Sequence, residues 1–391
     1  MNQELLANLP SDIVIDVLSR LPIRAIISCK CVCKSWLNLL NTAEFINYHH
    51  SKSTPGIAVL QYQMRGDFLT LFEIKDELEP DEHHELHYIP ITQLYIDDVV
   101  KISYSITLEG STNGLLLLRE ISNKPDSLYI CNPITREYTK ISSPENTKRS
   151  YPTVVTYGFG VSSVTGHHKV VWISHDCIRD RETHKLLSIP RIECCVYTLE
   201  TGSWRSISPG EPMEYTFLTN GGLLNGRFHC LVRDLKGSFF ISCLDLETEV
   251  FTTFSSPCPL PGSRTNLVGL AVLESCLCLC DNTSNNEIVI WIMKEYGVEK
   301  SWRKEFVISK IPNHIGETYE AVHPIKIFKD GDILMCWWDF HMLYYCNKTK
   351  VTQSISVFTP QSEECLDGML YSPSFLSLKS RLKEDAVVST Y

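Results

Sequence analysis

The sequence has no long apolar run. Its longest strongly apolar stretch covers about residues 267–273 and stops at Glu274, whereas a membrane-spanning helix needs about 20 apolar residues. The first residues also lack the basic segment of a secretory signal, and Asp12 interrupts the first apolar stretch. We therefore expect neither a membrane span nor secretion, and predict a protein of the cytoplasm and/or nucleus.

An excess of basic side chains is also missing. The chain has 36 Lys and Arg against 46 Asp and Glu, a net charge of −10 over 391 residues. The first 50 residues hold four of each sign, so the whole negative charge belongs to residues 51–391. Such a surface repels phosphate backbones and anionic lipids. The composition therefore predicts no nucleic-acid partner and no membrane partner.

The common signatures of enzymes and cofactor sites are absent as well. There is no C-x-x-C pair, no G-x-S-x-G elbow and no G-x-x-x-x-G-K-[ST] loop. Residues 81–87 are rich in His, Asp and Glu, but their spacing is one residue short of H-E-x-x-H, and residues 73–85 contain seven acidic side chains. We interpret this stretch as a solvated acidic loop. The sequence therefore predicts no catalytic residue, no metal and no cofactor.

The 16 cysteines sit mostly inside apolar segments. A disulfide framework belongs to small secreted domains, and a free cysteine behaves as a small buried apolar residue. Cys276, Cys278 and Cys280 recur with a period of two, which places them on one face of a strand. We expect the cysteines, including Cys29, Cys31 and Cys33, to serve core packing.

The chain changes character near residues 51–56, a polar stretch that ends in Pro-Gly. Residues 4–50 have helical periodicity, and residues 55–380 have the pattern of strands and turns. Ser11 can cap a first helix, with its apolar face at positions 13, 14, 17, 18 and 21. Pro22 can start a second helix, residues 32–40 suit a third, and Asn41 or Thr42 can cap a short fourth turn through Phe45.

The helical segment has more apolar side chains than three short helices can hide. About 45 residues bury little surface alone. Ile15 lies off the main face of the first helix, and Leu9 and Pro10 precede it without an internal use. The excess indicates either a surface for a partner or a contact with the large domain.

Residues 9–24 and 29–36 resemble the plant form of the F-box, because the two Leu-Pro pairs and the Val-Cys-Lys-Ser-Trp block stand at the spacing of that family. An F-box is a three-helix module that binds the Skp-family adaptor of a cullin–RING ubiquitin ligase. The resemblance implies that the module and its adaptor face are formed by Leu9, Pro10, Ile13, Leu18, Leu21, Pro22, Val32, Cys33, Lys34 and Trp36.

A repeating unit of strands and turns fills the large domain. Turn residues at 114, 166, 226, 275 and 331 each precede an apolar strand, at spacings of 52, 60, 49 and 56 residues. Short strands in units of about 50 residues are typical of a β-propeller. Residues 57–110 suit a degenerate sixth unit, and a strand around Leu370 to Leu376 could close the ring against the N-terminal strands. We predict a kelch-like β-propeller of about six blades, with a β-sandwich as the alternative.

The same region is similar to the plant F-box-associated, kelch-like domain. The resemblance covers roughly residues 100–360, with motifs at 113–116, 132–135, 157–160, 168–171 and 294–302. Members of that family use this domain to hold the protein that is ubiquitinated.

Together the two resemblances imply a non-catalytic, substrate-recognition subunit of an SCF (Skp–cullin–F-box) ubiquitin ligase. It would bind the adaptor through residues 4–50 and an unknown target protein through residues 55–380. Two alternatives remain open at this stage. One is a propeller that binds or transforms a carbohydrate or small molecule, which would need convergent carboxylates or a metal in a pocket. The other is a scaffold that binds the adaptor without delivering a target, which ubiquitin transfer to a bound protein would distinguish.

Overall fold

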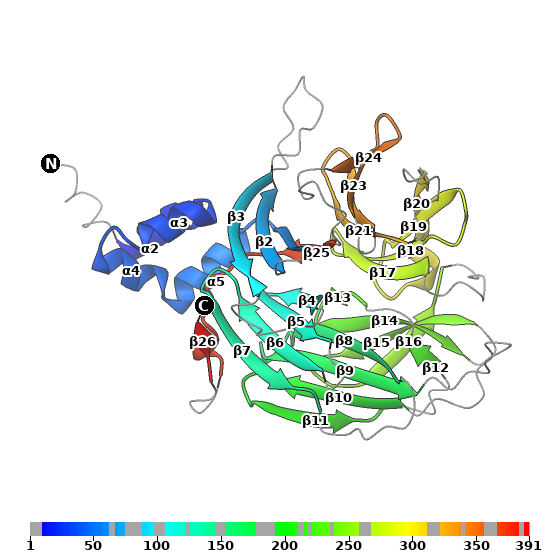
Figure 1. The fold of residues 1–391 in the computed structure, drawn as a ribbon, viewed down its shortest axis with the longest axis horizontal. Helices are drawn as coiled ribbons and strands as arrows, with labels where there is room; N and C mark the ends of the chain where they lie inside the picture. The colour runs from blue at the N-terminus through cyan, green and yellow to red at the C-terminus, as the bar shows by residue number, and fades with distance from the viewer. Residues whose placement is uncertain are drawn as a thin grey trace.

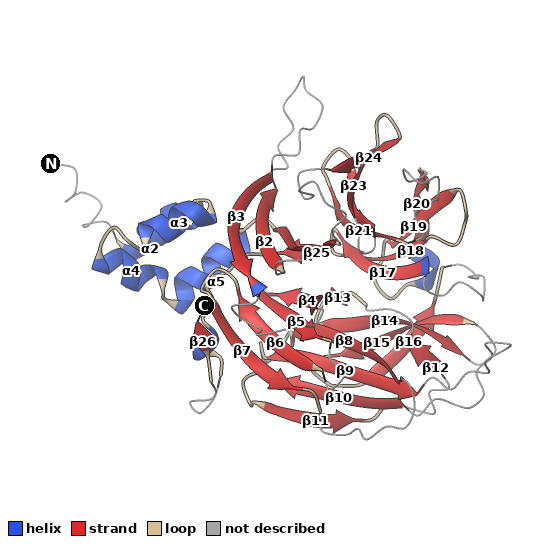
Figure 2. Cartoon of the chain, viewed as in Figure 1, coloured by secondary structure: helices blue, strands red, loops and turns tan. Residues whose placement is uncertain are grey.

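Helices gather at the N-terminal end of the chain, and strands are the main element of the remainder (Figures 1 and 2). The computed structural model describes residues 10–61, 67–74, 88–96, 106–121, 126–144, 153–176, 192–209, 215–217, 221–234, 238–257, 267–310, 321–337, 341–355, 366–382 and 387–390. None of the described helices is long and apolar enough to cross a membrane.

The helical module consists of α2 (Ser11–Ser19), α3 (Ile23–Cys29), α4 (Lys34–Leu40) and α5 (Ala43–Lys52). Pro10 and Pro22 occupy the N-cap positions of α2 and α3 with extended backbone and no side-chain cap, so the predicted cap at Ser11 is wrong. Thr42 does cap α5, because its hydroxyl accepts from the Phe45 amide.

Helix α5 is a full helix of ten residues rather than the short turn through Phe45 that we predicted. Its length follows from the spacing of its buried side chains, since Phe45 and His49 are four residues apart and both lie on its inner face. Only residues 53–55 separate the end of α5 from the first strand.

The buried face of α2 is not the predicted one. Val14, Ile15 and Leu18 are buried, whereas Ile13 and Val17 are 44% and 51% exposed. The apolar residues at positions 13, 14, 15, 17, 18 and 21 span an arc of about 200° around the helix axis, at 100° per residue. This arc is wider than one contact can cover. The core therefore takes one sector of that arc and leaves the other sector outside.

The described strands form six antiparallel sheets, each of four or five strands. The first sheet contains β25 (Leu366–Tyr371), β1 (Gly56–Gln61), β2 (Phe68–Ile74) and β3 (Tyr88–Tyr95), and the second contains β4 (Ile106–Thr112), β5 (Leu115–Glu120), β6 (Ser127–Asn132), β7 (Glu137–Ser142) and β26 (Ser389–Thr390). The third contains β8 (Thr153–Val161), β9 (His168–Asp176), β10 (Ile192–Thr198) and β11 (Ser203–Ile207), and the fourth contains β12 (Tyr215–Phe217) and β13 (Leu223–Leu224), both beside β14 (Arg227–Asp234), then β15 (Phe239–Asp245) and β16 (Phe251–Ser255). The fifth contains β17 (Val268–Leu273), β18 (Cys276–Asp281), β19 (Glu287–Met293) and β20 (Trp302–Ser309), and the sixth contains β21 (Val322–Ile327), β22 (Ile333–Trp337), β23 (His341–Cys346) and β24 (Val351–Ile355).

These sheets are the blades of a six-bladed β-propeller, and the β-sandwich alternative is wrong. The first strands of neighbouring sheets lie side by side around the ring, β25 with β4, β4 with β8 and β17 with β21. Each hydrophobic core joins two adjacent blades rather than two opposed sheets. Leu115 and Leu117 pack toward β8 and β9, while Leu116 and Leu118 pack toward β1 and β2. Period-two alternation thus buries both faces of one strand.

The ring closes through strand pairing between the two ends of the propeller. β25 pairs antiparallel with β1, with Leu370 opposite Ile57. This confirms the predicted closing strand, although it ends at Tyr371 and residues 372–377 continue as irregular backbone. The predicted sixth unit, residues 57–110, is wrong at its end, because β4 is the inner strand of the next blade.

The predicted cysteine packing holds in β18 and for Cys29, which is half-buried against the core of the helical module, and it fails for Cys31 and Cys33. Cys278 and Cys280 are buried against the blade that contains β22, whereas Leu277 and Leu279 face the blade before it. Cys31 and Cys33 are exposed, because they lie in the turn between α3 and α4 on the outside of the module.

The predicted turns connect the first two strands of their blades and carry left-handed backbone. Asn113 and Gly114 have φ of 48° and 82°, which suits the type I′ hairpin that Asn-Gly favours. Glu274 and Ser275 adopt the same geometry, with φ of 47° and 61°, although neither is glycine. Left-handed backbone costs a residue with a Cβ about 1–2 kcal/mol.

We expect Ser275→Gly to stabilise the protein by about 1 kcal/mol, because glycine adopts positive φ without that cost. Thermal melting of the full chain measures the effect. Ser163→Gly is the matched control, since Ser163 is an exposed turn residue without positive φ, and glycine there should lower stability slightly. A Ser275→Gly protein that melts at or below the wild-type temperature would contradict the strain at this turn.

Candidate functional site

The residues assigned to the adaptor face fall into two groups. Leu18 is buried in the core of the helical module, and Leu21 and Trp36 are half-buried beside it. The others are exposed, namely Pro10, Ile13, Pro22, Val32, Cys33 and Lys34. Leu9 lies outside the described residues. The first group builds the module, and the second is available to a partner.

Apolar side chains are concentrated on the outside of the helical module. Val32 is 64% exposed and Leu37 is 39% exposed. Ile13, Val17 and Ile27 are exposed as well, at 40% or more. We call these five residues the outer apolar residues. Contiguous exposed apolar groups are typical of surfaces that a protein partner covers. Val17, Ile27 and Leu37 were missed by motif matching, although the four-residue spacing of Val17 from Ile13 could have indicated it.

An ionic cluster fixes α2 to α5. The Asp16 carboxylate accepts hydrogen bonds from Arg20 (2.7 Å), from Lys52 (2.8 Å) and from the Tyr48 hydroxyl (2.9 Å). The hydrogen bonds from Lys52, Tyr48 and Arg20 hold the pKa of Asp16 well below its usual range. Because all these groups are largely in water, the cluster orients the helices rather than supplying much stability.

A contact between the module and the propeller lies on the inner side of the helices. Phe375, which follows β25, is buried in the same hydrophobic cluster as Val14, Ile26 and Phe45. The ring centroid of Phe375 lies 5.6 Å from that of His49, and Lys30 Nζ lies 4.4 Å from the same centroid. Part of the surplus of apolar side chains in the helical segment therefore contacts the large domain, which is one of the two interpretations of the sequence.

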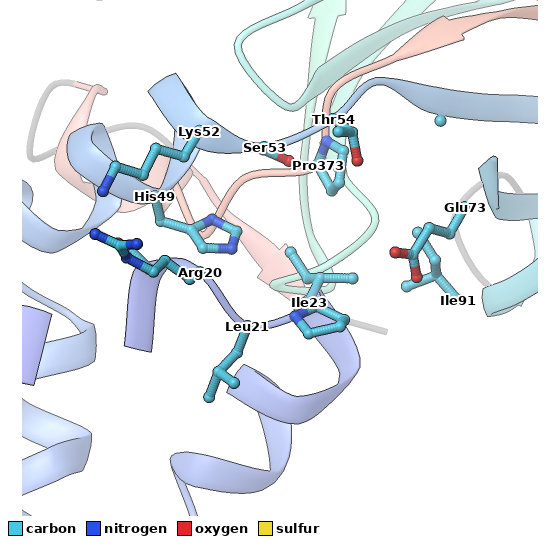
Figure 3. Close-up of a pocket in the computed structure, with 13 residues that line it drawn as sticks. Arg20, Leu21, Ile23, His49, Lys52, Ser53, Thr54, Glu73, Ile91 and Pro373 are labelled. Atoms are coloured by element: carbon cyan, nitrogen blue, oxygen red, sulfur yellow. The ribbon is translucent and has the colours of Figure 1, made fainter. Parts of the chain in front are cut away.

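A pocket of about 340 Å³ lies beside this contact (Figure 3). The helical module supplies the segment from Ser19 to Ile23 together with His49 and Lys52, and the linker supplies Ser53 and Thr54. Gly56, Glu73, Ile91 and Pro373 line the propeller side. The His49 ring points toward the space between Ile23 and Pro373 (Figure 3). The pocket thus lies between the two domains, next to the contact made by Phe375.

His49 is buried at this junction in its neutral form. Its Nδ1 has no hydrogen-bond partner among the described residues, and its ring stacks on Phe45 at 5.7 Å. Burial lowers the pKa of His49 below its ordinary value of 6.5, because desolvation disfavours the charged imidazolium.

The described part of the chain contains no cluster of three or more His, Cys, Asp or Glu side chains that could hold a metal ion. Residues 81–87, the acidic and His-rich stretch, lie outside the described residues. His229 is an example of an isolated buried histidine with protein partners. Its Nδ1 forms a hydrogen bond with the Gly222 carbonyl, and its Nε2 forms one with the Tyr296 hydroxyl.

The low pKa of His49 predicts a pH dependence of stability. Above about pH 6.5 both the folded and the unfolded chain carry a neutral ring; below it the unfolded chain takes up a proton that the folded chain resists, so stability falls as pH falls. His49→Phe should remove this component. Unfolding by urea at pH 7.5 and pH 5.5 should show a smaller drop for the variant than for wild type.

The matched control is His167→Phe, at a half-buried histidine in the β8–β9 turn. It should leave the drop at wild-type size. Equal drops in wild type and His49→Phe would show that His49 remains free to take up a proton in the folded protein.

Comparison with known proteins agrees with both parts of the fold. Residues 6–48 match the F-box domain family, and residues 64–378 match the F-box associated β-propeller domain family. Two F-box proteins of Arabidopsis thaliana, one of them F-box protein CPR1, are each 28% identical; they cover 84% and 83% of this chain, and 78% of each relative is covered. An F-box/kelch-repeat protein of the same plant is 25% identical over 95% of this chain and 96% of its own.

Among solved structures, the six-bladed fucose-binding lectin of Aleuria aurantia superposes with a TM-score of 0.39 at 9% identity, over 79% of this chain and 98% of the lectin. So remote a likeness transfers neither a ligand nor an activity. The family matches span nearly the whole chain and coincide with the helical module and the ring. The chain therefore belongs to the F-box proteins that carry an F-box-associated β-propeller domain.

Proposed function

We propose that this protein is the substrate-recognition subunit of an SCF ubiquitin ligase. An F-box followed by a β-propeller supports a substrate-adaptor role in such ligases generally. The observation that carries the proposal for this chain is the set of outer apolar residues, which the chain itself leaves uncovered. The partner that covers them is a Skp-family adaptor, through which the cullin–RING ligase is recruited.

The two apolar faces of the F-box have separate roles in this proposal. The inner face packs on Phe375 and thereby on the propeller, so it is already occupied. Ile13 and Val17 lie on a different sector of α2 and stay accessible. Adaptor and propeller therefore do not compete for the same side chains, and both can be attached to the module at once.

The mechanism is proximity rather than catalysis. The adaptor holds one end of the chain at the ligase, the propeller holds a target protein, and activated ubiquitin is brought near the lysines of that target. Holding two reactants together raises their effective concentration, to the millimolar range with short tethers. The role requires no catalytic residue, and we propose that it is performed in the cytoplasm and/or nucleus.

Substituting the outer apolar residues should abolish adaptor binding without unfolding the protein. We expect Ile13→Asp combined with Val32→Asp to weaken binding to a Skp-family adaptor by at least about thirtyfold, since buried charges at an interface centre are costly. An acidic residue in the first turn of α2 is favourable for the helix, so thermal melting should change little. Calorimetric titration of the full chain measures the affinity.

Val164→Asp is the control, because Val164 is 79% exposed in the β8–β9 turn of the propeller. It should bind the adaptor like wild type. Wild-type affinity in the double variant would contradict the assignment of the adaptor face. Ubiquitin transfer to captured proteins in a reconstituted ligase then distinguishes a substrate receptor from a scaffold, which would show adaptor binding without transfer.

A further inference from the structure

The core of the F-box is completed by a residue from the opposite end of the chain. Phe375 is 4% exposed and belongs to the cluster that otherwise consists of Val14, Ile15, Leu18, Ile23, Ile26, Leu40 and Phe45. Its ring contacts both His49 of α5 and the ammonium group of Lys30 at the end of α3. Lys30 also donates a hydrogen bond to Asn41, at the end of α4. Phe375 thus contacts the F-box through more than one helix.

The backbone on both sides of Phe375 is fixed to the propeller. Asn132, at the end of β6, donates from Nδ2 to the carbonyls of Ser374 (2.9 Å) and Leu376 (2.7 Å). A side chain that is itself fully buried therefore holds both neighbours of Phe375. After the single turn that follows Asn132, Glu137 at the start of β7 accepts from the Ser377 hydroxyl and from the Leu378 amide.

Ring closure determines where this segment starts. Tyr371, the last residue of β25, donates its hydroxyl to the Gly114 carbonyl at 3.0 Å. The β4–β5 turn approaches so closely that a Cβ at Gly114 would lie 2.3 Å from the Cβ of Ser374. The position of Phe375 is therefore set by the closing strand and by the blade next to it, independently of the F-box.

The F-box is consequently attached to the propeller at two separate points. One is the linker of residues 53–55, which enters β1 at Gly56, where a Cβ would lie 2.1 Å from the Phe72 carbonyl oxygen. The other is the contact of the helical cluster with Phe375, where Ile91 and Ile134 of the propeller also pack against the cluster. A body held at one point can rotate about it, whereas a body held at two points has a restricted orientation. The pocket beside the contact shows that the rest of this interface is not tightly filled, and Phe375 is the propeller residue that is buried within the cluster.

We propose that Phe375 is a positioning residue that fixes the angle between the F-box and the propeller. This inference rests on the proposed function, because the angle matters only if the F-box carries the adaptor and the propeller carries a target. A fixed angle holds the target surface at one distance from the site where ubiquitin arrives, and thereby selects which lysines receive it.

The test uses the full chain in complex with a Skp-family adaptor and compares wild type with Phe375→Ala. The seven helical residues of the cluster remain, and an adaptor in excess stabilises the folded module by mass action, so adaptor affinity should stay within about threefold of wild type. Small-angle X-ray scattering of the complex should show a larger maximum dimension. In a reconstituted ligase without a target, ubiquitin should reach more of the propeller's own lysines, as mapped by mass spectrometry.

Two further variants separate positioning from general destabilisation. Phe375→Leu retains an apolar side chain at the contact and should restore scattering and the lysine map toward wild type. Phe228→Ala makes the same truncation of a buried ring in another blade, in a cluster that includes no residue of the F-box or of β1, and should leave the scattering and the lysine map unchanged.

Wild-type scattering and an unchanged lysine map in Phe375→Ala would overturn the proposal. A loss of adaptor affinity beyond about tenfold in Phe375→Ala alone would overturn it too, since Phe375 would then be required for the F-box to fold. Failure of the proposed function is a different result, because wild type itself would then bind no Skp-family adaptor.

Discussion

The pairing of β25 with β1 is the constraint on which the rest of the structure depends. It joins residues 366–371 to residues 56–61, so every blade between them is enclosed in one ring and the inner edges of the sheets are covered by neighbours. The same pairing brings the segment after β25 to the N-terminal helices. Closure of the propeller and placement of the F-box are thus two consequences of one strand pair.

The interior of the ring explains why so much of it could be predicted from the sequence. The run Leu115 to Leu118 is apolar at every position because its strand is buried between two blades, and its odd and even residues belong to different cores. Asn113-Gly114 before this run and Asn225-Gly226 before β14 favour I′ turns on their own. Turn signals recur in five of the six blades, and their spacing therefore predicts the architecture.

The helical module shows where such reasoning ends. The apolar arc on α2 is wide enough for two contacts, and its periodicity does not say which sector faces inward. The inward sector packs in a cluster with Phe375, which is distant in sequence and stands in irregular backbone without a motif. The F-box motif correctly identified the module, but it did not separate Leu18, which builds the core, from Ile13 and Val32, which face outward.

The wide apolar arc is then a requirement rather than an accident of composition. A helical segment of this size buries little surface alone, so packing on the propeller on one side adds to its stability. If that contact used all of its apolar surface, no apolar area would remain for a ligase component. The side chains at 14, 15 and 18 satisfy the first demand, and those at 13 and 17 remain for the second. A module that must be attached to its own chain and also recruit a partner therefore carries two apolar faces on one short helix.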